Sequence, residues 1–178
     1  LDARQPSVLS YSGPDLRSTQ TIAAQFTAAI GVAQRRCWIA TPYFVPDEPL
    51  MLALVTAAWR GVDVRVLVPS PQSNDSRLVS WAARSYYDEL MAASVQIYEY
   101  QAGMLHAKFL VIDDQVAAIG SANMDIRSFY LNYEVTAMFY DRGVADQLAA
   151  IFRDHLRRAI EVRPVHRSRL ARLLSPLL

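Results

Sequence analysis

Cysteine and long apolar runs are both scarce in this sequence. Cys37 is the single cysteine among 178 residues, so no disulfide can form within the chain. It opens the apolar run CWIATP, where we expect a buried thiol rather than a nucleophile or a metal ligand. No uninterrupted apolar stretch approaches the roughly 20 residues that a membrane-spanning helix needs. We therefore expect that this chain by itself does not span a bilayer.

Net charge is also nearly absent. Eighteen basic and 17 acidic side chains leave a formal charge of +1, which gives no global field that would concentrate nucleic acid or an anionic surface. Any anion must therefore be held locally. With 52% hydrophobic residues, the chain is long enough to bury one sizeable core. It begins at Leu1 rather than methionine, so we expect either a removed amino terminus or a piece of a longer protein.

Helical and strand patterns alternate along most of the chain. The first residues, with Pro6, Gly13 and Pro14, are typical of a linker. The patterns predict helices from Ser18 or Thr19 to about 33, from Asp47 to Gly61, over 75–92 and over 145–160, and strands at 37–42, 62–69, 95–100, on both sides of 113–115 and at 133–140. Such alternation, followed by a hairpin, predicts an α/β domain with a mixed β-sheet flanked by helices.

Several aromatic residues have two interpretations. Tyr43 and Phe44 follow a predicted strand, where ligands of α/β folds bind, and either line an acyl or glycerol pocket or pack in the core. Core packing is the commoner outcome, and the same holds for Trp81, Tyr86 and Tyr87 on the predicted third helix.

The stretch LHAKFLVIDDQVAAIGSANMD, residues 105–125, places polar groups between two apolar strands. Side chains two apart on a strand share a face, so His106 and Lys108 project together while the apolar residues between and after them face the other way. If the strands fold back about Asp114, residues whose numbers sum to about 228 lie opposite each other. This register sets Lys108 beside Gly120.

The same hairpin brings Ser121 and Asn123 to the end that carries His106 and Lys108. Glycine at 120 permits a close approach, and the hydroxyl and amide groups can donate hydrogen bonds. A lysine charge with such donors suits the extra negative charge on a five-coordinate phosphorus, and neutral imidazole can attack phosphorus or relay a proton near pH 7. The pattern therefore predicts an oxyanion site for a phosphate group.

Asp113 is expected to act differently. It lies roughly 20 Å along a straight strand from His106, at about 3.3 Å per residue. We therefore expect it to shape the turn through bonds to backbone amides, or to hold another segment of the chain.

The spacing H-x-K-x4-D-x6-G-S-x-N resembles the signature of the phospholipase D superfamily. The blocks TPYFVPDE, GVDVRVLVP, WAARSYYDEL, YEYQAGMLHAK and RSFYLNYE look like the carboxy-terminal half of bacterial cardiolipin synthases, and the resemblance runs from about residue 18 to about 160. It implies a phospholipase D-like domain over 18–161 that forms one half of a pseudo-two-fold pair, with a linker at 1–17 and a basic, leucine-rich tail at 162–178.

In that family two such motifs face each other. One histidine becomes phosphorylated, the other protonates the leaving alcohol, and neither a metal nor another cofactor is needed. The resemblance implies that Lys108 and Asn123 hold phosphate oxygens, and that Glu134 accepts a hydrogen bond from the imidazole and so fixes its tautomer. Matched to the signature, the catalytic residues are His106, Lys108 and Asp113, the substrate-binding residues are Ser121 and Asn123, and the supporting residues are Gly120 and Glu134.

Only one motif is present, because His155 and His166 have no lysine two residues later. If the chain is the second half of a longer enzyme, the resemblance implies that His106 is the general acid and base, with the nucleophile in the other half. If two copies pair, His106 serves in both roles, once from each subunit.

The leading functional prediction is a phosphatidyltransferase half-site that forms cardiolipin from two phosphatidylglycerol molecules at the bacterial cell membrane. The alternative is a single-motif phosphodiesterase or nuclease active as a homodimer, although nucleic acid is not the expected partner at this charge. A third interpretation is a lipid-binding or scaffold fragment without activity of its own. The acceptor remains open among glycerol, a second lipid, ethanolamine and water.

The tail also has two interpretations. Its helical part either lies in a membrane interface, with Arg167, Arg169 and Arg172 near lipid phosphates, or docks on its own domain.

Overall fold

The computed structural model describes residues 7–14 and 21–164. The helices are α1 (Thr21–Val32), α2 (Glu48–Trp59), α3 (Arg77–Arg84), α4 (Tyr87–Ala92), α5 (Ile126–Tyr130) and α6 (Arg142–Leu156). The strands are β1 (Ser7–Ser12), β2 (Arg36–Ala40), β3 (Phe44–Val45), β4 (Asp63–Pro69), β5 (Gln96–Tyr100), β6 (Phe109–Ile112), β7 (Val116–Gly120), β8 (Met124–Asp125), β9 (Glu134–Phe139) and β10 (Ala159–Glu161). Within these ranges, no helix has the length and apolar character needed to cross a bilayer.

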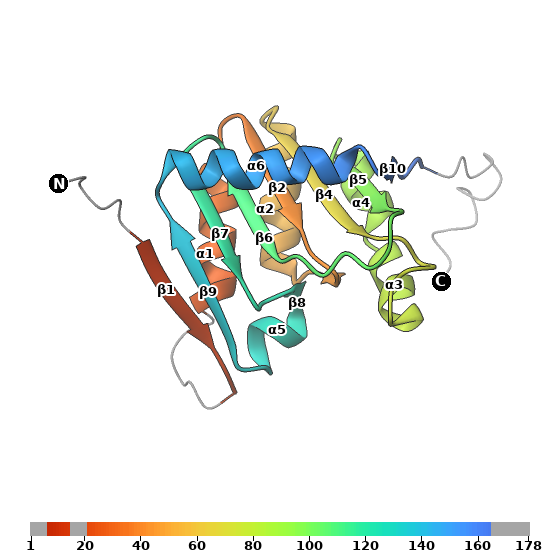
Figure 1. Ribbon diagram of the computed structural model, residues 1–178, viewed down its shortest axis with the longest axis horizontal. Coiled ribbons are helices and arrows are strands. Elements are labelled where there is room, and N and C mark those ends of the chain that lie inside the picture. The colour runs from red at the N-terminus through yellow and green to blue at the C-terminus, as the bar shows by residue number, and fades with distance from the viewer. Residues whose placement is uncertain (1–6, 15–20, 165–178) are drawn as a thin grey trace.

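Eight strands form one mixed sheet in the order β1-β9-β7-β6-β2-β4-β5-β10 (Figure 1). The central strands β2, β4 and β5 are parallel, and every other neighbouring pair is antiparallel. A separate pair, β3 and β8, is parallel. The predicted mixed α/β sheet flanked by helices is confirmed.

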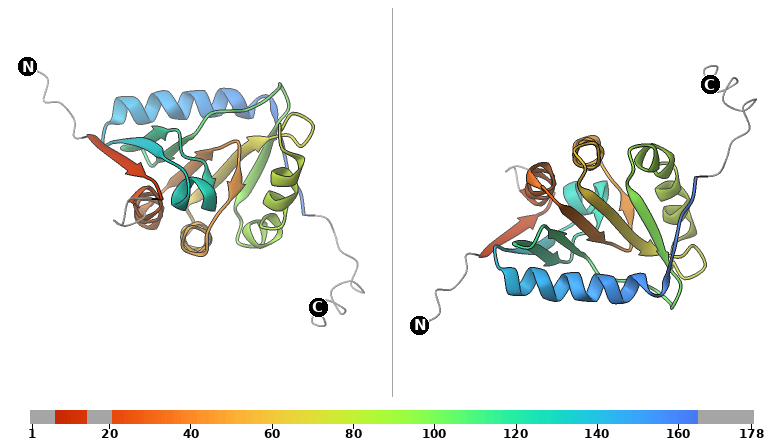
Figure 2. Two further views of the ribbon diagram at one scale, coloured as in Figure 1. Left: turned by 90° about the horizontal axis from the view of Figure 1, so that it is seen from below. Right: turned by 90° about the horizontal axis from the view of Figure 1, so that it is seen from above.

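Helices cover the two faces of the sheet unequally (Figure 2). On one face, α1, α2 and α4 enclose the larger core cluster, which includes Ile22, Leu54 and Leu90. On the other face, α6 packs mainly over β7, β6, β2 and β5, with Phe152 stacked on Trp38 at 5.2 Å between ring centroids. The edge formed by β9 and β1 therefore lies outside the cover that α6 provides.

Helix ends follow from local chemistry. Asp47 caps α2, because its carboxylate accepts a hydrogen bond from the Leu50 backbone nitrogen at 3.0 Å. Gly61, at φ +86°, turns the chain just after that helix. Asp141 caps α6 in the same way, accepting from Val144 at 2.8 Å. The starts of α2 and α6 are thereby fixed by single carboxylates.

Two expectations differ from the structure. The sequence predicts one helix over 75–92, whereas α3 ends at Arg84 and α4 begins at Tyr87. Between them, the hydroxyl of the capping residue Ser85 donates to the Ala82 carbonyl at 2.7 Å. The sequence places residues 7–12 in a linker, whereas they form β1 along β9, since the short pattern SVLSYS suits an edge strand. The expected cap at Ser18 or Thr19 and tail residues 165–178 lie outside the described residues.

Candidate active site

The polar residues of the predicted hairpin meet at one end of the sheet. Lys108 lies just before β6 and Gly120 ends β7, and the Gly120 backbone nitrogen donates to the Lys108 carbonyl at 3.3 Å. The paired residues of these strands, such as Phe109 with Ile119, have numbers that sum to the predicted value. The apolar residues alternating with His106 and Lys108 pack in the core cluster below α6. The predicted register is therefore confirmed.

Gly120 allows β9 to approach β7 closely. A Cβ atom at this position would lie 2.2 Å from the Val135 carbonyl oxygen and 2.7 Å from the Thr136 Cα atom. Next to it, the Ser121 backbone nitrogen donates to the Val135 carbonyl at 2.9 Å, and the Val135 nitrogen donates to the Ser121 hydroxyl at 3.0 Å. The glycine thus lets β9 carry Glu134 to the catalytic end.

Replacement of Gly120 by alanine is expected to lower the free energy of unfolding by about 1–3 kcal/mol, because backbone atoms of β9 must move. The control is Gly31→Ala in α1, where nothing lies within 4 Å of an added Cβ and alanine stabilises the helix by up to about 1 kcal/mol. Urea denaturation of both variants measures the difference. Equal stability of Gly120→Ala and the parent chain would show that the close approach is dispensable.

Glu134 is held by two neighbours. Its Oε2 atom accepts a short hydrogen bond from the Ser121 hydroxyl, and its Oε1 atom accepts one from the Asn132 amide at 3.1 Å. In the part of the chain that the structure describes, no hydrogen bond joins Glu134 to the exposed His106 imidazole. Each carboxylate oxygen retains acceptor capacity for a further donor.

Asn123 is buried just before β8, three residues ahead of α5. Its backbone nitrogen and its amide nitrogen both point at the Ser128 hydroxyl, at 3.1 and 3.2 Å, while its Oδ1 atom is buried without a hydrogen-bond partner. A half-turn of the amide would let Ser128 donate to Oδ1 and would free the NH2 group. That group would then lie without a partner at the buried position that Oδ1 occupies.

Lys108 is the positively charged residue that the hairpin contributes to the site. Its ammonium group donates to the His106 carbonyl at 3.0 Å. Partial burial lowers the pKa of Lys108 below the ordinary lysine value, and the nearby carboxylates of Glu134, Asp125 and Asp75 oppose this shift without cancelling it. The lysine therefore lies among negative charges that favour its protonated form.

A groove of about 610 Å³ opens beside Asn123. Its lining residues are Tyr43, Val45, Ser76, Val79, Asn123, Asp125, Ile126, Arg127, Leu131 and Asn132. This volume is in the range of small-molecule sites. Tyr43 lines this groove, as expected if it forms part of a ligand pocket. Its hydroxyl donates to the Asp75 carboxylate at 2.7 Å, and this hydrogen bond together with burial raises the pKa of Tyr43. Phe44, in contrast, is fully buried.

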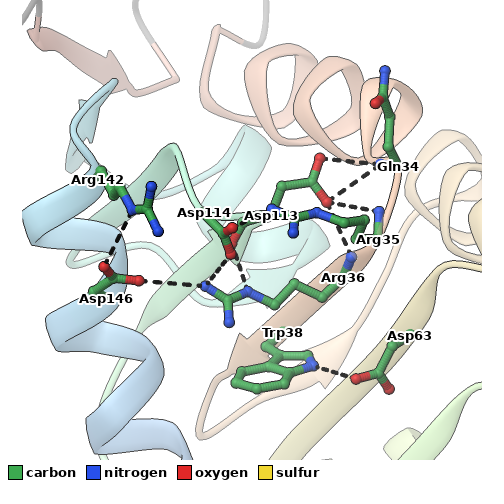
Figure 3. A network of polar contacts seen from close by, with 9 residues as sticks. All are labelled: Gln34, Arg35, Arg36, Trp38, Asp63, Asp113, Asp114, Arg142 and Asp146. Atoms are coloured by element: carbon green, nitrogen blue, oxygen red, sulfur yellow. Dashed lines mark hydrogen bonds and ion pairs between the residues drawn. The ribbon is translucent and has the colours of Figure 1, made fainter.

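Asp113 follows β6, whereas His106 precedes this strand, so the strand separates the two residues. Figure 3 shows the Asp113 carboxylate beside Gln34, Arg35 and Arg36. Its carboxylate accepts hydrogen bonds from the backbone nitrogens of Gln34, Arg35 and Arg36 at 3.1, 2.7 and 3.0 Å. Its own backbone is left-handed, at φ +50°. Asp113 thus joins the hairpin turn to the segment that enters β2, and the structure does not bring it to the other signature residues.

Residues beyond the signature hold the site together. Ser128 and Asn132 anchor Asn123 and Glu134, and the Thr41 hydroxyl accepts from the Met124 backbone nitrogen at 3.1 Å. The block RSFYLNYE contains Ser128 and Asn132, but its sequence predicts no role for either, because their partners are known only once α5 is placed. A mixed sheet that gathers a histidine, a lysine and amide and hydroxyl groups at one end defines a domain of the phospholipase D class.

Comparisons of the sequence define the class further. Residues 26–156 match the family described as cardiolipin synthase, PLD-like domain. Cardiolipin synthase 2 of Bacillus cereus is 46% identical over 180 residues, covering 96% of this chain and 34% of that protein. Cardiolipin synthase A of Pseudomonas putida is 45% identical over 169 residues, covering 89% of this chain and 35% of that protein. The chain belongs to the cardiolipin synthase family of phospholipase D-like domains, and it spans about a third of the length of these relatives.

Solved structures share the fold. Nuc, a phospholipase D family member from Salmonella typhimurium, superposes with a TM-score of 0.72 at 19% identity, covering 89% of this chain and 100% of that chain. Phosphatidylserine synthase from Haemophilus influenzae gives a TM-score of 0.69 at 14% identity, covering 91% of this chain and 41% of that chain. The Nuc chain therefore consists of one domain of this fold.

Proposed function

We propose that this chain is one catalytic half of a phosphatidyltransferase that forms cardiolipin from two molecules of phosphatidylglycerol at the bacterial cell membrane. The observation that carries the proposal is the meeting of His106, Lys108, Ser121 and Asn123 at one end of the sheet, within a domain that matches the cardiolipin synthase family. Asp113 has a structural role in this proposal.

In the first step, a histidine of the other half attacks the phosphorus and forms a P–N bond while the P–O bond to glycerol breaks. His106, as general acid, gives its proton to the departing oxygen. In the second step, His106 takes the proton from a hydroxyl of the second phosphatidylglycerol, whose oxygen forms the new P–O bond while the P–N bond breaks. Both histidines then return to their starting protonation states.

The charges around Lys108 support the need for a second half. Three carboxylates act on this lysine, those of Glu134, Asp125 and Asp75. A phosphodiester anion bound beside Lys108 would be repelled by them unless further cations approached from another segment. A second motif, with its own lysine, would provide that charge.

The uncovered part of the sheet offers a surface for this second half. Leu9, Tyr11, Ile119 and Val135 are 56, 54, 45 and 38% exposed. They share one face, because Ile119 and Leu9 both pair with Ala137, and Tyr11 pairs with Val135. This face is the one that α6 covers only in part, and Val135 contacts Ser121 of the site. We propose that the second half packs here, adjacent to the catalytic end.

Replacement of Ile119 by glutamate is expected to weaken association with the second half at least tenfold, because a charge would be buried in an apolar contact. The matched control is Ile160→Glu, at the opposite edge of the sheet and 63% exposed. Analytical ultracentrifugation of this chain with the amino-terminal part of the protein measures both. Equal affinity of the two variants would move the contact to another surface.

The products formed by the full-length protein test the proposed function. Transfer predicts one glycerol released for each cardiolipin formed from phosphatidylglycerol in detergent micelles, with no phosphatidic acid. Mass spectrometry in 18O-labelled water distinguishes the reactions, because hydrolysis would put the label into phosphatidic acid. Labelled phosphatidic acid as the main product would make the protein a phospholipase and would overturn the proposal.

A second candidate is a phosphodiesterase formed by two copies of this chain. It is favoured because the structural match spans the whole Nuc chain, so that a chain of about this size forms a separate polypeptide there. In that case the purified 178-residue chain would be dimeric by light scattering and would cleave bis-p-nitrophenyl phosphate without a further polypeptide. The formal charge of +1 argues against a nuclease among such enzymes.

A further inference from the structure

Large apolar side chains project from both helices that flank the groove. Leu78 and Trp81 of α3 are 75 and 77% exposed, and Leu131, just after α5, is 63% exposed. Ile126, which begins α5, is 43% exposed. We refer to these four residues as the apolar rim. Ile126 and Leu131 line the groove itself, whereas Trp81 lines a second hollow together with Ser80 of α3. Monomeric surfaces rarely expose a large apolar patch without a binding purpose.

Two residues of the apolar rim border the active site. Ile126 and Leu131 line the groove that reaches Asn123, and Val79, between the two exposed residues of α3, lines its other side. α5 contacts β8 and α3 contacts its partner strand β3, so both helices lie at the lower end of the molecule in Figure 1 and are in view from below in Figure 2, left. Whatever covers the rim therefore also faces the mouth of the groove.

The chemistry of the rim fits a lipid surface better than a protein. A polypeptide packed across α3 and α5 would close the groove between them, whereas a bilayer would deliver a lipid phosphate into it. Tryptophan is favoured at the boundary between headgroups and acyl chains. Two exposed arginines accompany the apolar residues: Arg127 of α5, which donates to the Asn132 side chain at 3.2 Å, and Arg84 of α3, which forms an ion pair with Glu99 at 2.7 Å. Of the two, Arg127 keeps its charge uncompensated by a carboxylate within salt-bridge distance among the described residues, so it is the one that can interact with an anionic headgroup.

We propose that the apolar rim inserts into the interfacial layer of a bilayer containing anionic phospholipid, and so sets the mouth of the groove at the level of the headgroup phosphates. This inference rests on the proposed function, which supplies the reason for a lipid phosphate to enter the groove. Insertion to about 5–10 Å is typical of interfacial apolar faces and would bury the outer side chains of α3. The groove then opens toward the substrate rather than toward water.

Vesicle binding by the 178-residue chain tests the inference. The double variant Leu78→Ser, Trp81→Ser is expected to bind vesicles of phosphatidylglycerol and phosphatidylcholine at least tenfold more weakly, as measured by flotation. The matched control is Leu52→Ser, Trp59→Ser, which removes the same residue types from α2, where they are 63 and 72% exposed. The control is expected to bind like the parent chain, and equal loss in both variants would overturn the proposal.

Fluorescence gives a second readout. In a Trp59→Phe background, Trp81 is the one exposed tryptophan, since Trp38 is buried. Its emission is expected to shift to the blue on vesicles and to be quenched by lipids brominated near the headgroup. If Trp81 instead became shielded from acrylamide on addition of the amino-terminal part without lipid, a polypeptide would cover the rim and the proposal would be wrong.

Failure of the proposed function is measured separately. Vesicle binding requires no turnover. If the full-length protein binds vesicles through Trp81 but makes no cardiolipin, only the proposed phosphatidyl transfer is wrong. The rim variants, placed in the full-length protein, are expected to retain cleavage of water-soluble bis-p-nitrophenyl phosphate. Loss of that cleavage would assign Leu78 and Trp81 to the catalytic site rather than to membrane contact.

Discussion

Replacement of His106 by glutamine in the full-length protein is expected to lower kcat/KM for cardiolipin formation by about 10²–10⁴-fold, the usual contribution of a general acid and base. Glutamine keeps a polar side chain of similar length but cannot transfer a proton at neutral pH. Since His106 is exposed at the end of the sheet, the free energy of unfolding should change by less than about 0.5 kcal/mol. His155→Gln, on α6 against Tyr100, is the control expected to retain activity.

The choice of leaving group separates the two roles open to His106. A p-nitrophenyl ester of phosphatidic acid releases a phenolate that needs no protonation. If His106 is the general acid, the His106→Gln variant should still release one equivalent of nitrophenol rapidly and accumulate phosphohistidine on the other half. A rate equally low for this ester and for phosphatidylglycerol, with no burst, would make His106 the nucleophile.

Replacement of Asp113 by alanine is expected to lower the free energy of unfolding by about 2–4 kcal/mol. Three backbone N–H groups lose a charged acceptor, and alanine is strained at φ +50°. Asp113→Asn should cost less, because asparagine tolerates the left-handed region and keeps one acceptor oxygen. Asp146→Ala is the control, since its ion pairs with Arg36 and Arg142 are long, at 3.9 and 3.7 Å, and exposed, and it should cost less than about 0.5 kcal/mol.

The same variants decide whether Asp113 takes part in the chemistry. At a temperature where Asp113→Asn is fully folded, its kcat for cardiolipin formation is expected to equal that of the parent protein within about twofold. Chemical denaturation followed by circular dichroism gives the folded fraction for this comparison. A large loss of kcat with normal stability would contradict the structural role.

The hairpin was predictable from the sequence because its register depends on residues that are close together in the chain. Strand periodicity fixes the faces of His106 and Lys108, and the turn at Asp114 fixes the register that places Gly120 beside Lys108. The separation of Asp113 from His106 followed from strand length alone. These features require no knowledge of the rest of the fold.

The remainder of the site depends on contacts between distant segments. The five residues of α5 and the two of β8 are too short for a periodic pattern, and they are placed by Ser128 against Asn123 and by Thr41 against Met124. The sequence also cannot separate packing from exposure on α3, where Trp81 occupies a position that equally suits a core. In the structure Trp81 is 77% exposed, whereas Tyr87 of α4, after the break at Ser85, is buried in the core.

The central claim is that this chain supplies half of a phosphatidyltransferase site. The most direct measurement is cardiolipin formation from phosphatidylglycerol in detergent by the purified chain, before and after addition of the amino-terminal part of the protein. The account predicts no turnover by the chain alone, turnover after the amino-terminal part is added, and loss of that turnover when this chain carries His106→Gln. Turnover by the chain alone would contradict the account, because two copies of His106 would then complete the site.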